Sequence, residues 1–123
     1  MRFQPTREAL AWAGGFFAGE GSVHICYNGG KPKNLPYPQV AISQSGDLGR
    51  EVLDRFHIAT GALGKIYGPK PPGRNQKQIR WLWEANGFEK TQAIMALLWP
   101  WLGSVKQSKF EYICRAYLTA RGY

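Results

Sequence analysis

The sequence predicts an α+β domain in which helices pack on one face of a four-stranded antiparallel sheet. The spacing of hydrophobic residues alternates along the chain between the helical period and the strand period of two. The resulting segment order is α-β-β-α-β-β-α-α, and loops rich in glycine and proline follow the first and third strands. With 123 residues, 44% of them hydrophobic, the chain is long enough for one packed core, so residues 1–123 are expected to form a single domain.

The first helix is predicted over residues 6–19, with Thr6 as its N-cap and Glu8 in the first turn. Its interior is unusual because it contains two adjacent glycines, Gly14 and Gly15. Each glycine inside a helix destabilises it by about 1 kcal/mol relative to alanine. Small residues spaced along one face allow the backbone of a second helix to approach closely. We therefore expect this helix to pair with its copy in a homodimer, through Ala11, Gly14, Gly15 and Ala18.

The strands are predicted at residues 22–27, 39–43, 64–67 and 78–84, with loops at 28–38 and 68–77. A helix marked by Leu48, Val52, Phe56 and Ala59 is expected to stop at Gly61. Two further helices are expected to open with the capping boxes Asn86/Glu89 and Ser104/Gln107, the first ending before Pro100 and the second running through Phe110, Ile113 and Tyr117.

One face of the sheet is predicted to be apolar, with Ile79, Trp81 and Trp83 turned inward. The opposite face carries His24, Gln39, Ser43, Lys65, Gln78 and Arg80, and the strand loops are basic. Sixteen Lys and Arg against eight Asp and Glu give a net charge of +8, which favours a polyanionic partner. Strands can enter the major groove of DNA, where such side chains read base edges. An ordinary solvated sheet face is the alternative.

Other protein classes fit the sequence poorly. The apolar stretch at residues 9–19 is too short and glycine-rich to span a bilayer, and Glu8 interrupts the region where a signal peptide would have its apolar block. Two cysteines, Cys26 and Cys114, are too few for a disulfide framework or a zinc site and are expected to be reduced thiols.

Glu20 follows the first helix, where a carboxylate meets the negative end of the helix dipole unless a cation offsets it. Pairing of this helix about a two-fold axis would bring two Glu20 carboxylates together in an oxygen-rich site suited to Mg²⁺. A solvated glutamate in a Gly-Glu-Gly turn is the alternative reading of the same residues.

Residues 13–21 read AGGFFAGEG, with Trp12 before them and Ser22-Val23 after them. This segment resembles the signature of LAGLIDADG homing endonucleases, in which many members read LAGFFDGEG. The likeness continues in family order through Gln44, the segment GKIY at 64–67, and PWL at 100–102 with Lys106 four residues further on. The resemblance implies an αββαββα fold, with paired motif helices and sheets that straddle DNA.

The resemblance also implies roles for individual residues. Glu20 would bind the catalytic metal with the Gly21 carbonyl, Gln44 would position solvent, and Lys106 would lie near the scissile phosphate, although Lys109 is placed for a similar role. The metal would be Mg²⁺, with Mn²⁺ able to replace it and Ca²⁺ supporting binding without cleavage. The expected DNA contacts are His24, Asn28, Lys31, Lys33, Gln39, Lys65, Tyr67, Lys70, Arg74, Lys77, Gln78 and Arg80.

The resemblance implies an intron-encoded homing endonuclease that acts as a homodimer. Its expected activity is metal-dependent, sequence-specific cleavage of double-stranded DNA at a long pseudo-palindromic site. The expected compartment is the cytoplasm of a bacterial or phage-infected cell, or an organelle matrix, with no membrane partner and no small-molecule substrate. Two alternatives remain: a catalytically inactive DNA-binding regulator or RNA-splicing maturase on the same scaffold, and a basic interaction protein that uses the small-residue helix only to dimerise.

Overall fold

The computed structural model describes residues 5–27, 35–75 and 77–123. Its elements, in chain order, are α1 (Arg7–Glu20), β1 (Gly21–Tyr27), β2 (Pro36–Ser45), α2 (Gly46–Ala59), β3 (Lys65–Lys70), β4 (Arg80–Asn86), α3 (Phe88–Leu98), the 3₁₀ turn η2 (Trp99–Trp101) and α4 (Gly103–Ala120). This order confirms the predicted α+β plan.

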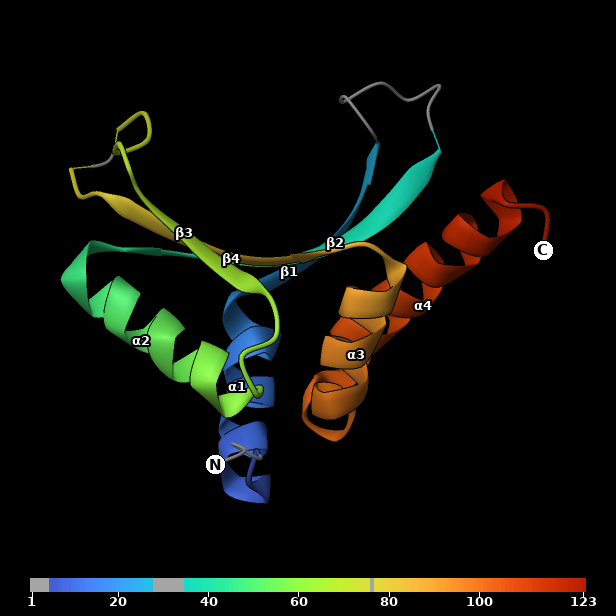
Figure 1. Ribbon diagram of the computed structural model, residues 1–123, viewed down its shortest axis with the longest axis horizontal. Coiled ribbons are helices and arrows are strands. Elements are labelled where there is room, and N and C mark those ends of the chain that lie inside the picture. Colours follow the sequence, from blue (N-terminus) through green and yellow to red (C-terminus); the bar gives the residue numbers. More distant parts are fainter. Residues whose placement is uncertain (1–4, 28–34, 76) are drawn as a thin grey trace.

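The four strands form one antiparallel sheet in the order β1-β2-β4-β3. Figure 1 shows that the sheet is strongly curved and that all the helices lie against its convex face. The two hairpins, β1-β2 and β3-β4, rise at opposite ends of the concave face, which no helix covers (Figure 1). The fold therefore leaves a saddle-shaped surface open to a partner.

The core lies between the convex face of the sheet and the helices. Val23, Val40 and Trp83 point into it from three strands and are fully buried. The Trp83 ring meets the edge of the Phe56 ring from α2 at a centroid distance of 4.8 Å, and its Nε1 donates to the Leu63 carbonyl at 3.0 Å. Burying side chains of this size contributes roughly 1.5–3 kcal/mol each and fixes α2 against the sheet.

Helix α1 stands end-on beneath the sheet, with its C-terminus at the sheet and its N-terminus pointing away (Figure 1). Thr6 is its N-cap, as predicted, and its Oγ1 accepts a hydrogen bond from the Ala9 amide at 3.1 Å. Phe17 is fully buried in the core. Gly14 packs against its own chain, because an added Cβ would lie only 2.5 Å from Trp101 Cβ.

Several strand boundaries differ from the prediction. β2 begins at Pro36, inside the predicted loop. β4 pairs with β2 only from Gln39 onward, so the earlier part of β2 has one side without a partner strand. Prolines, which lack an N–H, are tolerated at such an edge. β3 continues to Lys70 through an irregularity in register. β4 begins at Arg80, so Gln78 precedes the strand.

Two predicted core positions are also wrong. Leu48 is 79% exposed because the buried side of α2 runs through Gly49, Leu53 and Phe56. Ile79 is 39% exposed because it lies just before β4 rather than on its buried face.

Neither predicted capping box forms. Helix α3 has Gly87 as its N-cap without a side-chain hydrogen bond, because the Asn86 amide is engaged with side chains of the sheet. Helix α4 begins at Gly103, and Gln107 Nε2 donates instead to the Trp99 carbonyl at 2.7 Å. Tertiary contacts have replaced the local caps in both cases. Within the described residues, no helix has the length and apolar character needed to cross a bilayer.

The two adjacent glycines of α1 provide a test of this packing. Replacing Gly14 with alanine forces η2 away from α1, because Trp101 Cβ is fixed to the backbone of η2 and cannot rotate aside. We expect Gly14→Ala to lower the free energy of unfolding by about 1–3 kcal/mol.

The matched control is Gly15→Ala, whose added Cβ has nothing within 4 Å in a single chain. Its alanine gains up to about 1 kcal/mol of helix propensity. Urea unfolding followed by circular dichroism at low protein concentration compares the two variants. Equal stability of Gly14→Ala and Gly15→Ala would contradict the α1–η2 contact.

Candidate DNA-facing site

The junction between α1 and β1 sets the position of Glu20. The helix passes directly into the strand at Gly21, whose N–H donates to the Phe17 carbonyl. A Cβ at residue 21 would lie 2.5 Å from the buried Phe17 ring, so only glycine fits this junction. Glu20 is consequently held at the sheet end of α1 with its side chain exposed.

Gln44 comes to Glu20 from a different element. It lies near the end of β2, on the same side of the strand as Ile42, and its Nε2 donates to Glu20 Oε2 at 3.3 Å. The contact joins residues that are 24 positions apart in the sequence. The structure thus brings together two of the three residues singled out as a catalytic group.

The oxygen ligands at this junction suit a hard divalent cation. Glu20 offers a carboxylate and Gly21 a backbone carbonyl, the ligand types that Mg²⁺ prefers. Across the described residues, no three His, Cys, Asp or Glu side chains gather into a closed metal site. The donors of one chain therefore fit an open Mg²⁺ site, of the kind that one or two carboxylates complete together with substrate phosphates.

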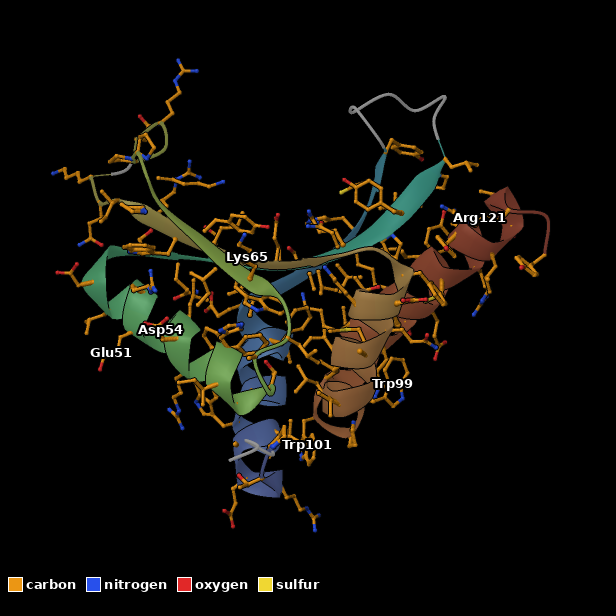
Figure 2. The ribbon with its side chains drawn as sticks, in the orientation of Figure 1. Glu51, Asp54, Lys65, Trp99, Trp101 and Arg121 are labelled. Carbon is orange, nitrogen blue, oxygen red and sulfur yellow. The ribbon has the colours of Figure 1, made fainter. Side chains whose placement is uncertain are left out.

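Among the described residues, Lys106 makes neither an ion pair nor a hydrogen bond with Glu20. It lies in the first turn of α4, five residues after Trp101, and Trp101 packs opposite Gly14 in the middle of α1. Gly14 precedes Glu20 by six residues, a rise of about 9 Å along the helix. Figure 2 shows Trp101 beside the part of α1 that lies away from the sheet. Within the expected catalytic group, the contact that a single copy shows is therefore the one between Glu20 and Gln44.

Arg50 is a cation near Gln44 that the sequence reading missed. Trp81 is the cross-strand partner of Gln44, and the Arg50 guanidinium lies over the Trp81 ring at 4.7 Å. Asp54 holds Arg50 Nε at 3.0 and 3.1 Å, so the arginine is oriented by its own helix. The sequence feature that could have identified Arg50 is its position in the first turns of a helix that begins two residues after Gln44.

The centre of the concave face carries a connected row of polar side chains. Gln39 Oε1 lies 2.6 Å from His24 Nε2, and Gln39 Nε2 donates to Asn86 Oδ1 at 2.6 Å and to Glu84 Oε2 at 3.3 Å. Asn86 Nδ2 donates to Glu84 Oε1 at 3.2 Å. These hydrogen bonds cross three strands and hold the row in one arrangement, which favours specific over non-specific contacts with a partner.

The rest of the predicted DNA contacts fall into three groups. Lys65, Tyr67 and Arg80 lie on β3 and β4, and Lys65 Nζ lies 5.5 Å from the centre of the Tyr67 ring; Figure 2 labels Lys65 near the middle of the sheet. Lys70, Arg74, Lys77 and Gln78 are exposed around the β3–β4 turn. Asn28, Lys31 and Lys33 lie outside the described residues.

One face of α1 is left open by the rest of the chain. Gly15 and Gly19 are exposed, and a Cβ at either position would have nothing within 4 Å. Ala11 and Ala18 are half-buried beside them. Gly14 is a correction to the predicted interface, because it is buried against Trp101 of its own chain.

Cys26 and Tyr37 form a cross-strand pair on the concave face. Burial raises the pKa of the Cys26 thiol, while a hydrogen bond with Tyr37 lowers it and the nearby Glu84 charge raises it. Burial also raises the pKa of the Cys114 thiol on α4. Both cysteines are free, and both are neutral thiols near pH 7.

Neither a protein-family model nor a curated protein sequence matches the chain. Solved structures do match it. The group I intron-encoded homing endonuclease I-CeuI, complexed with DNA, matches 96% of this chain with a TM-score of 0.60 and 12% identity. The homing endonuclease I-CvuI, in complex with a DNA target, matches 94% with a TM-score of 0.57 and 17% identity. The LAGLIDADG homing endonuclease I-GzeII, in complex with its DNA target, matches 75% with a TM-score of 0.57 and 15% identity.

The present chain covers 56% of the I-CeuI chain, 65% of the I-CvuI chain and 28% of the I-GzeII chain. At these identities the comparison shows the fold. The chain has the fold of the LAGLIDADG homing endonucleases, which confirms at the level of architecture the resemblance that its motif indicates.

The two thiols allow the concave-face geometry to be checked by chemistry. With Cys114→Ser present, alkylation by iodoacetamide reports on Cys26 alone, and the rate should still be rising above pH 9.0, the ordinary thiol pKa. Tyr37→Phe removes the hydrogen bond that lowers the Cys26 pKa, so the rate at pH 8 should fall. The control is Cys114 in the Cys26→Ser chain, whose rate Tyr37→Phe should leave unchanged. A faster Cys26 reaction in Tyr37→Phe would contradict the pairing.

Proposed function

We propose that the chain is a metal-dependent, sequence-specific DNA endonuclease that acts as a homodimer on a long pseudo-palindromic site. The observation that carries the proposal is the Glu20–Gln44 contact at the exposed end of α1, beside an uncovered sheet face lined with polar and basic side chains. The fold shared with DNA-bound homing endonucleases supports the same conclusion.

Duplex DNA suits the concave face by charge and by shape. Two chains of net charge +8 carry +16, so binding should weaken steeply with salt as counterions are released from the phosphates. Side chains on one face of a strand are about 6.6 Å apart, which is close to the rise of two base pairs. Basic residues around the β3–β4 turn would follow the phosphate backbone while the central row meets base edges.

Dimerisation through α1 accounts for its exposed glycines. Gly15 and Gly19 each destabilise an isolated helix by about 1 kcal/mol, and neither makes room for anything within its own chain. A second copy of α1 packed against this face would use the absence of side chains for close backbone contact. A two-fold axis parallel to α1 would place both Glu20 carboxylates at the same, sheet-proximal end of the pair.

The residues at the junction have separate parts in the proposed hydrolysis. Glu20 and the Gly21 carbonyl would hold Mg²⁺, which when bound polarises the scissile phosphate and lowers the pKa of water. Gln44 restrains the Glu20 carboxylate through its 3.3 Å hydrogen bond, so the ligand keeps one orientation. Arg50, close to Gln44 through Trp81, would supply positive charge toward the phosphate.

Each protomer would cut one strand, so the dimer would make a double-strand break. In this scheme Lys106 would contact the scissile phosphate when DNA is bound and offset the charge that builds up there. I-CvuI has been crystallised with DNA in the presence of calcium, and in the presence of magnesium with the DNA not cleaved, so divalent cations accompany DNA in structures of this fold.

The metal assignment is tested by Glu20→Gln, which keeps the shape of the side chain and removes its charge. We expect normal folding and retained DNA binding in Ca²⁺, with cleavage in Mg²⁺ reduced at least about 100-fold. The readout is fragment-end sequencing from a randomised duplex library, alongside selection by binding from the same library.

The matched control is Glu51→Gln, which removes the same charge from an exposed position on the outer side of α2 (Figure 2). It should cleave like the parent. Cleavage at parental rate by Glu20→Gln would show that Glu20 is not the metal ligand. Site selection without breaks by the unmodified chain would favour the regulator or maturase instead.

Dimerisation is tested by Gly15→Leu. The added side chain has open space in one copy, so the fold should persist, but it would hold two α1 helices apart. We expect sedimentation velocity to show a monomer, with cleavage lost. Ala93→Leu, at an exposed position on α3, is the control and should remain dimeric. A monodisperse Gly15→Leu dimer would exclude this interface.

A further inference from the structure

Glu84 is an acidic residue in the middle of the face proposed to meet a polyanion. It lies on β4, in register with Lys65 on β3 and with Ala41 on β2, and is half-buried. A carboxylate placed there repels phosphate and loses hydration when DNA binds. The two oxygens of an ionised carboxylate offer about four acceptor sites, which leaves room for a ligand group that donates hydrogen bonds.

The hydrogen bonds around Glu84 have a defined direction. An ionised carboxylate only accepts, so the Gln39 and Asn86 amides must turn their NH₂ groups toward it, at 3.3 and 3.2 Å. Gln39 is then left with its oxygen toward His24, and His24 Nε2 carries the proton in that 2.6 Å contact. One acidic residue thus fixes which way two amides and one imidazole point.

We propose that Glu84 is a specificity-determining residue that selects, in each half-site, a base presenting an amino group in the major groove. The proposal rests on the DNA-binding function above and names what the central row recognises. Cytosine N4 and adenine N6 are the amino donors on major-groove edges, whereas guanine and thymine present acceptors there. The carboxylate accepts from the amino group and discriminates against an acceptor edge by leaving two acceptors face to face.

Arg80 sets a second position relative to Glu84. The two residues lie four apart on β4, with side chains on the same face, which corresponds to about 13 Å. An arginine pairs most specifically with guanine through O6 and N7. The half-site should therefore contain an amino-bearing base and a guanine separated by about four base pairs.

The experiment measures base preference with the full-length chain. The unmodified chain, Glu84→Gln and the control Glu89→Gln are each used to select from a randomised duplex library in Ca²⁺. Glu89 lies in the first turn of α3 and is exposed, so this control removes the same charge at another place. The Glu84→Gln amide can donate or accept, so its preference for an amino-bearing base should fall about tenfold or more at one position of each half-site.

A second arm deletes the amino group from the DNA instead of the charge from the protein. In the selected site, 2-pyrimidinone replaces cytosine or purine replaces adenine at the assigned position. The unmodified chain should lose about tenfold in affinity, and Glu84→Gln should lose much less, because the interaction is already absent. The analogue that produces the loss identifies the base, and this arm stands even if the variant folds poorly.

The outcomes separate the two proposals. Enrichment of guanine or thymine at the position, or equal losses of both proteins on the amino-deleted site, would overturn the role of Glu84 while leaving the endonuclease in place. A uniform gain in affinity of Glu84→Gln for all sequences would show phosphate repulsion alone and would also overturn it. Failure of the unmodified chain to select any duplex would overturn both proposals together.

Discussion

Helix α1 is packed between α2 and η2, and this packing leaves a single face of the helix uncovered. Phe17 anchors the helix in the core, and Gly14 allows Trp101 to pack directly against the helix backbone. The uncovered face contains Gly15 and Gly19. Because Gly21 cannot carry a side chain beside the Phe17 ring, the helix also ends at a fixed point on the sheet.

The same arrangement separates the hydrophobic core from the polar face of the sheet. Every helix packs on the convex face, so the hydrophobic core is complete without the concave face (Figure 1). The concave face is then free to carry polar side chains that are ordered by one another rather than by packing. The row from His24 to Glu84 shows this ordering, since three strands contribute to one set of hydrogen bonds. In the proposed function, recognition of DNA and hydrolysis meet where α1 reaches the sheet.

Much of this could be predicted from the sequence because the signals were local. Thr6 capped its helix as expected, the strand alternation identified the inward-facing Trp83, and Glu20 was singled out by the motif. The contact of Gln44 with Glu20 was expected only as part of the family resemblance, and the structure supplies its geometry.

The other features depended on distances in space, which the order of residues along the chain does not give. A small residue at Gly14 looks the same whether it faces a second copy or Trp101 of its own chain. The Ser104/Gln107 capping box had the right spacing, but the Gln107 side chain donates its hydrogen bond to the Trp99 carbonyl instead. Lys106 followed the family order, but among the described residues it forms no ion pair with Glu20.

In the proposed function, two copies of α1 carry two equivalent cutting sites to one DNA duplex. Sequencing both ends of every break made in a randomised duplex library, with Mg²⁺ and with Ca²⁺, tests it most directly. We expect Mg²⁺-dependent paired breaks, one on each strand, related by the two-fold symmetry of a single pseudo-palindromic site. Enrichment of a site by binding with no breaks in either metal, or breaks confined to one strand, would contradict it.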